Sequence, residues 1–104
     1  MIPLVESRRS EIAELCRRHR VRRLEVFGSA TAAGEDFDPH GSDLDFLVEF
    51  LPLERGQRAD AYFGLLEGLQ DVFGRHIDLV MTRAIRNRYF MEAIQAHREV
   101  LYAD

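Results

Sequence analysis

The segment from residue 42 to residue 50, Ser-Asp-Leu-Asp-Phe-Leu-Val-Glu-Phe, combines carboxylates with apolar residues that favour a β-strand. Side chains alternate between the two faces of a strand, so Asp43 and Asp45 are predicted to share one face. Leu44 and Phe46 then pack on the other face. Neighbouring carboxylates repel each other unless a cation lies between them. Mg²⁺ is the usual cation, because it is bound by one or two carboxylates together with substrate phosphates and water.

A Gly-Ser pair, Gly28-Ser29, ends the preceding apolar run, residues 24–27. Where a strand turns into a helical segment, several backbone N–H groups lack partners and attract an anion such as a phosphate. Gly28 would allow the backbone to approach the phosphate closely, and the Ser29 hydroxyl would donate a hydrogen bond to it. The alternative is an ordinary turn in which Ser29 caps a helix.

A further carboxylate, Asp78, lies in the apolar segment Ile77-Asp78-Leu79-Val80. A lone ionised carboxylate costs several kcal/mol in apolar surroundings unless it is paired or coordinated. Asp78 is therefore a candidate third metal ligand. The alternatives are an exposed strand edge and a salt bridge to an arginine such as Arg75.

The distribution of charge restricts the chemistry. All 14 basic residues are arginine, so a P-loop lysine and a Schiff-base lysine are excluded. Residues 35–54 carry seven acidic residues and no arginine, which favours cations and repels bare phosphate. A phosphorylated substrate is therefore expected to approach as a metal complex.

The periodicity of the chain predicts one α/β domain over residues 1–104, with a small mixed sheet of about four strands flanked by helices. The expected helices are residues 4–19, with Pro3 at the first position, 57–73, with Gly74 as its cap, and 86–96. The expected strands are residues 24–27, 44–50, 77–80 and 100–102. Tyr62, Phe63 and Phe73 are expected in the core.

The remaining features predict a cytoplasmic protein with no membrane contact, because no signal peptide or long apolar segment is present. Cys16 is the only cysteine, which excludes an internal disulfide. The arginine-rich segment 17–23 does not indicate nucleic-acid binding, because a helix C-terminus favours arginines and no aromatic residue is interleaved for base stacking. The arginines of this segment could equally well bind an acidic face of a partner protein.

Gly28-Ser29, the Asp43-Leu44-Asp45 segment and Asp78 together resemble the nucleotidyltransferase superfamily, to which DNA polymerase β belongs. The sequences of residues 27–30 and 42–50 are similar to those of the minimal nucleotidyltransferases. These proteins are prokaryotic antitoxins that are paired with HEPN-type ribonuclease toxins. The resemblance covers nearly the whole chain, since residues 98–102 also resemble the ending of such proteins.

The resemblance implies that Asp43, Asp45 and Asp78 are catalytic and bind two Mg²⁺ ions. It implies that Gly28, Ser29 and Ser42 contact the nucleotide; these are the candidate cofactor-binding residues. The implied reaction transfers AMP from ATP to a hydroxyl group, with tyrosine favoured, of a HEPN toxin that is thereby neutralised. The alternative is a non-catalytic antitoxin that masks the toxin by binding.

One segment departs from the family pattern. Many members carry an arginine shortly after Gly-Ser, whereas this chain continues Ala30-Thr31-Ala32-Ala33-Gly34. Arg83, Arg86 and Arg88 are candidates to supply the positive charge instead.

Overall fold

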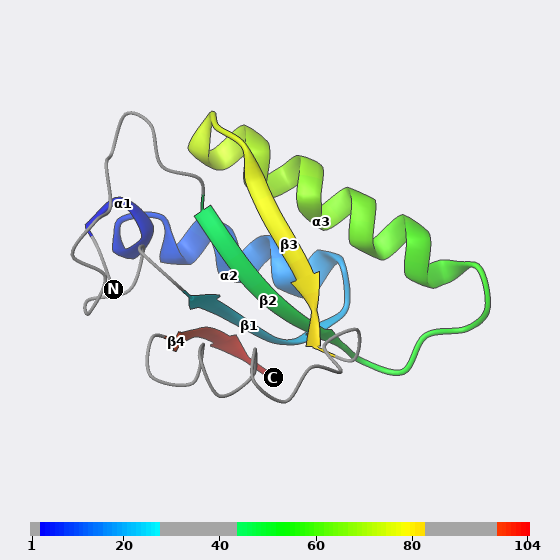
Figure 1. Cartoon of the computed structure of the whole chain (residues 1–104). Helices are drawn as coiled ribbons and strands as arrows, with labels where there is room; N and C mark the ends of the chain where they lie inside the picture. The colour runs from blue at the N-terminus through cyan, green and yellow to red at the C-terminus, as the bar shows by residue number, and fades with distance from the viewer. Residues whose placement is uncertain (1–2, 28–43, 83–97) are drawn as a thin grey trace, which may run out of the picture.

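Four strands form one mixed sheet in the computed structural model, which describes residues 3–27, 44–82 and 98–104 (Figure 1). In chain order they are β1 Val21–Phe27, β2 Leu44–Phe50, β3 Ile77–Met81 and β4 Arg98–Ala103. Their order across the sheet is β3-β2-β1-β4, with β1 antiparallel to β2 and β4, and β2 parallel to β3. The α/β class and the small mixed sheet predicted from the sequence are confirmed.

The two longer helices, α2 Arg9–Arg18 and α3 Gln57–Phe73, lie on one side of the sheet, behind it in Figure 1. A short helix, α1 Pro3–Glu6, precedes α2. Helix α3 connects the parallel strands β2 and β3. Parallel neighbours need such a crossover connection, since a tight turn cannot join them. None of the described helices is long and apolar enough to cross a membrane.

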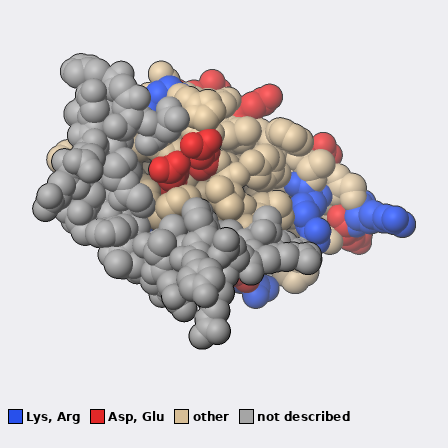
Figure 2. Space-filling model, in the orientation of Figure 1, with Lys and Arg blue, Asp and Glu red and all other residues tan. Residues whose placement is uncertain are grey.

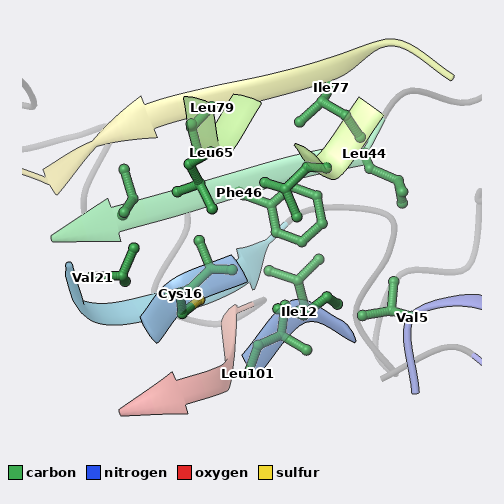
Figure 3. Close-up of a cluster of buried hydrophobic side chains, with 14 residues drawn as sticks. Val5, Ile12, Cys16, Val21, Leu44, Phe46, Leu65, Ile77, Leu79 and Leu101 are labelled. Atoms are coloured by element: carbon green, nitrogen blue, oxygen red, sulfur yellow. The ribbon is translucent and has the colours of Figure 1, made fainter. Parts of the chain in front are cut away.

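The core fills the space between the helices and the sheet (Figure 3). Phe46 of β2 is fully buried, and its ring stacks on Phe73 of α3 with the ring centroids 6.0 Å apart. Ile12 of α2 and Leu65 of α3 are also fully buried. This packing turns Phe46 towards the helices, so its neighbour Asp45 projects from the opposite face of the sheet.

The helix predicted over residues 4–19 is divided into α1 and α2, so that prediction is corrected. The Ser7 hydroxyl donates a hydrogen bond to the carbonyl oxygen of Leu4 at 3.1 Å, and Arg8 leaves the helical region with φ −111° and ψ 13°. Serine side chains compete with the backbone for such bonds, which makes serine a poor residue for a helix interior. The predicted start at Pro3 is confirmed.

Helix α3 has its predicted bounds. Gly74 adopts a left-handed conformation with φ 61°, and its N–H donates to the carbonyl oxygen of Gln70 at 2.7 Å. Strands β1 and β4 are longer than the predicted 24–27 and 100–102, because the paired positions extend to charged residues, Arg23 in β1 and Arg98 and Glu99 in β4. The helix predicted near 86–96 lies outside the described residues.

The prediction that Phe63 belongs to the core is wrong. Its side chain is 58% exposed, and it contacts the edge of the Tyr62 ring at a centroid distance of 5.2 Å. The buried positions of α3 are Ala61, Leu65 and Leu69, which repeat every four residues along another side of the helix.

Cys16 is expected to resist thiol reagents while the chain is folded. Burial raises the pKa of its thiol from 9.0 to about 12, which lowers the thiolate fraction near pH 8 about a thousandfold. Labelling with a chromogenic disulfide should therefore be slow in buffer and rapid in denaturant. Rapid labelling of the native protein would show that the Cys16 side chain is not buried in the core between α2 and the sheet.

Candidate active site

Asp45 and Asp78 lie side by side on the face of the sheet opposite α2 and α3, which we call the site face. Strands β2 and β3 are parallel, and their register pairs Asp45 directly with Asp78. Paired residues of neighbouring strands project from the same face, with Cα atoms roughly 4.8 Å apart. The structure thus brings together two of the three carboxylates that the sequence predicts to act together.

The alternation of apolar and acidic residues along β2 and β3 places the carboxylates of Asp45 and Asp78 on the site face. Leu44 and Phe46, on either side of Asp45, are fully buried in the core. Strand β3 repeats this pattern, with Asp78 exposed between two buried neighbours. A slip of one residue in either strand would bury a carboxylate and expose apolar side chains, so the hydrophobic core fixes the register that forms the pair.

The carboxylate of Asp78 is accessible to a ligand. Its side chain is 50% exposed, and its Oδ1 lies 3.8 Å from Nδ1 of His76, which is itself 62% exposed. Solvent screens a pair of this kind, so it contributes little to stability. Because Asp78 is half exposed, it does not carry the desolvation cost expected for a lone carboxylate in apolar surroundings. Its surroundings match the alternative prediction, an exposed strand edge.

The end of β1 adjoins this pair of carboxylates. Phe27, the last residue of β1, is the register partner of Asp45. In the sequence, Gly28 directly follows this position, which neighbours Asp45. The other predicted site residues, which lie outside the described residues, are Gly28, Ser29, Ser42 and Asp43.

The donor set at the site face suits a hard cation. Two carboxylates on adjacent strands offer oxygen ligands of the kind that Mg²⁺ prefers, and Asp78 is open to solvent. No group of three or more metal-binding side chains occurs within residues 3–27, 44–82 and 98–104. Figure 2 shows acidic side chains at the centre and along the upper edge of the side of the molecule that carries the site face, and others beside the basic side chains on the right.

A second charged cluster was not predicted from the sequence. Glu25 of β1 is only 2% exposed, and its carboxylate accepts hydrogen bonds from Nε and Nη2 of Arg98 in β4. Nε of Arg23 lies 2.5 Å from Oε1 of the same carboxylate. The hydrogen bonds and the charge of Glu25 raise the pKa of Arg98. The sequence feature that could have indicated this cluster is the single glutamate, Glu25, within the otherwise apolar segment 24–27.

A cavity of about 420 Å³ lies at the opposite end of β2 and β3. Arg22, Glu49, Arg58 and Met81 are among its lining residues, and neither Asp45 nor Asp78 lines it. The cavity is therefore separate from the pair of carboxylates.

The family model described as the nucleotidyltransferase domain matches residues 9–101. The chain belongs to the nucleotidyltransferase family. A relative from Methanocaldococcus jannaschii, named "Putative protein adenylyltransferase MJ1379", is 32% identical over 94 residues, which cover 83% of this chain and 90% of the relative.

Two solved structures are similar to this nucleotidyltransferase. One, described as a "putative minimal nucleotidyltransferase", has a TM-score of 0.69 and 32% identity, covering 90% of this chain and 89% of the other. Another is a tri-AMPylated Shewanella oneidensis HEPN toxin in complex with an MNT antitoxin, with a TM-score of 0.64, 18% identity and coverage of 96% and 73%. At that identity, the second similarity shows the shared fold alone.

Proposed function

We propose that this nucleotidyltransferase transfers AMP from ATP to a hydroxyl group of a HEPN-type toxin and thereby neutralises it. The observation that carries the proposal is the direct register pairing of Asp45 with Asp78 on the site face. The family membership supports nucleotidyl transfer. The adenylyltransferase name of the archaeal relative and the AMPylated toxin of the similar complex support AMP as the transferred group and a protein as the acceptor.

We propose that Asp45 and Asp78, together with Asp43, hold Mg²⁺. When bound, Mg²⁺ would neutralise phosphate charge and stabilise the charge that develops on the departing pyrophosphate. Gly28, Ser29 and Ser42 are the proposed contacts of the nucleotide, because the chain reaches Gly28 directly after Phe27, the neighbour of Asp45.

In the proposed reaction, the acceptor oxygen forms a bond to the α-phosphorus of ATP. The bond from that phosphorus to the bridging oxygen breaks, and pyrophosphate leaves with the bonding electrons. Asp78 is the proposed recipient of the hydroxyl proton, because its carboxylate is half exposed beside Asp45. Tyrosine is the proposed acceptor, since its phenol, with a pKa of about 10, loses a proton more readily than an aliphatic hydroxyl.

The test is the intact mass of a HEPN-type toxin after incubation with this protein, ATP and Mg²⁺. An added mass equal to one or more AMP units is expected, together with loss of ribonuclease activity. Tandem mass spectrometry then identifies the modified side chain.

Masking of the toxin without catalysis is the second candidate. The segment Ala30–Gly34, which lacks the arginine found in many relatives, favours it. Masking predicts a stable complex and an inhibited ribonuclease without added mass or ATP. Such a result would contradict AMP transfer.

A further inference from the structure

A row of four residues crosses the site face at the end of β1. Arg98 of β4 is the register partner of Phe27, Phe27 is the partner of Asp45, and Asp45 is the partner of Asp78. Directly paired residues share a face, so all four side chains project from the site face. The row therefore aligns a cation with the pair of carboxylates.

The side chain of Arg98 is oriented by Glu25. Nη2 donates to Oε1 of Glu25 at 3.0 Å, and Nε donates to Oε2. This bidentate contact occupies one edge of the guanidinium plane and fixes its orientation. Glu25 is almost completely buried, and Arg98 keeps 21% of its side chain exposed.

The guanidinium of Arg98 retains hydrogen-bond donors after binding Glu25. An arginine has five N–H groups, and the bidentate contact uses two of them. Within the part of the chain that the structure describes, the remaining three, two of them on Nη1, have no acceptor. Donors held in a fixed plane at a partly exposed position suit an anionic oxygen.

The site face needs such a cation if it is to receive a nucleotide. Asp45 and Asp78 repel phosphate oxygens, and Glu25 adds a third negative charge to the same face. Arg23, the other partner of Glu25, is the register partner of Glu49 and lies farther from the row. Arg98 instead neighbours the last residue of β1, and two strand spacings, roughly 10 Å, separate its Cα from that of Asp45.

We propose that Arg98 binds a phosphate of the nucleotide through the part of its guanidinium that does not contact Glu25, and that Glu25 is the positioning residue that aims it. The proposal rests on the proposed function, since it assumes that the site face receives MgATP. It assigns the positive charge of the site to Arg98 of β4, whereas the sequence alone points to Arg83, Arg86 and Arg88.

The test compares ligand binding by the full-length wild type and Arg98→Gln, using NMR titration of the isotope-labelled protein. Arg98→Gln should raise the Kd for MgATP about tenfold or more, as expected for the loss of a hydrogen bond between charged groups. The Kd for magnesium tripolyphosphate should rise equally, while that for adenosine should stay unchanged. A purely structural role would weaken adenosine binding as well.

Three further variants control this experiment. Arg98→Lys keeps the charge and should bind MgATP more tightly than Arg98→Gln, whereas Glu25→Gln should weaken binding less than Arg98→Gln. Arg23→Gln removes the other arginine partner of Glu25 and should leave the Kd within about twofold of the wild type.

Unchanged MgATP binding by Arg98→Gln, or an equal loss of MgATP and adenosine binding, would overturn the role of Arg98. In that case, wild-type binding of MgATP would leave the proposed function intact. A wild type that binds no MgATP would reject both.

Discussion

Asp45→Asn is expected to reduce AMP transfer about a thousandfold. The amide keeps the size of the side chain but loses the negative charge that makes it a ligand for Mg²⁺. A bound metal stabilises the transition state by several kcal/mol, and each 1.36 kcal/mol corresponds to a tenfold change in rate. The measurement is the rate at which the mass of AMP is added to the HEPN partner at saturating MgATP. The free energy of unfolding should change by less than about 1 kcal/mol.

Glu49→Gln is the matched control for this variant. Glu49 lies on the same strand and the same face as Asp45, its side chain is 47% exposed, and its ion pair with Arg22 is long at 3.7 Å. Loss of this charge should leave the transfer rate within about twofold, because exposed ion pairs contribute little. Equal rates for Asp45→Asn and the wild type would remove Asp45 from the mechanism.

Glu25→Ala is expected to lower the free energy of unfolding by about 3 kcal/mol, because removal of one partner leaves Arg98 partly buried without its counter-charge. In a domain of this size, that loss lowers the melting temperature by roughly 12–24 °C. Thermal unfolding followed by circular dichroism measures the change. Glu25→Gln, which retains an oxygen acceptor, should lose less stability.

Glu11→Ala provides the comparison, because the Glu11 carboxylate also binds an arginine. Nη1 of Arg8 lies 2.8 Å from Oε1 of Glu11, but both side chains are about half exposed. The expected loss is below about 0.5 kcal/mol. Similar losses for Glu11→Ala and Glu25→Ala would show that burial does not distinguish the two ion pairs.

The sequence predicts the elements whose local patterns are strong. Strand β2 has the predicted bounds because apolar and acidic residues alternate around Asp45, and α3 has the predicted bounds because Gly74 supplies the left-handed cap. The break at Ser7 was missed, since the apolar periodicity of residues 4–19 continues across it. Periodicity reports which side chains are buried, whereas a local side-chain bond decides where a helix is interrupted.

The site could be predicted as a set of residues but not as an arrangement. Nothing local to Asp45 or Asp78 specifies that β2 and β3 are parallel neighbours in the register that pairs them. Glu25 and Arg98 are 73 positions apart, and they meet because β4 pairs with the far side of β1. A buried glutamate signals that a partner is needed, but strand order decides which arginine supplies it.

Transfer from ATP labelled at either the α- or the γ-phosphate tests nucleotidyl transfer most directly. The HEPN partner is incubated with this protein, Mg²⁺ and each labelled ATP in turn. We expect label from the α-phosphate on the partner and label from the γ-phosphate in released pyrophosphate, with both lost in Asp45→Asn. Label from the γ-phosphate on the partner, or an inhibited partner without label from either ATP, would contradict AMP transfer by the Asp45–Asp78 pair.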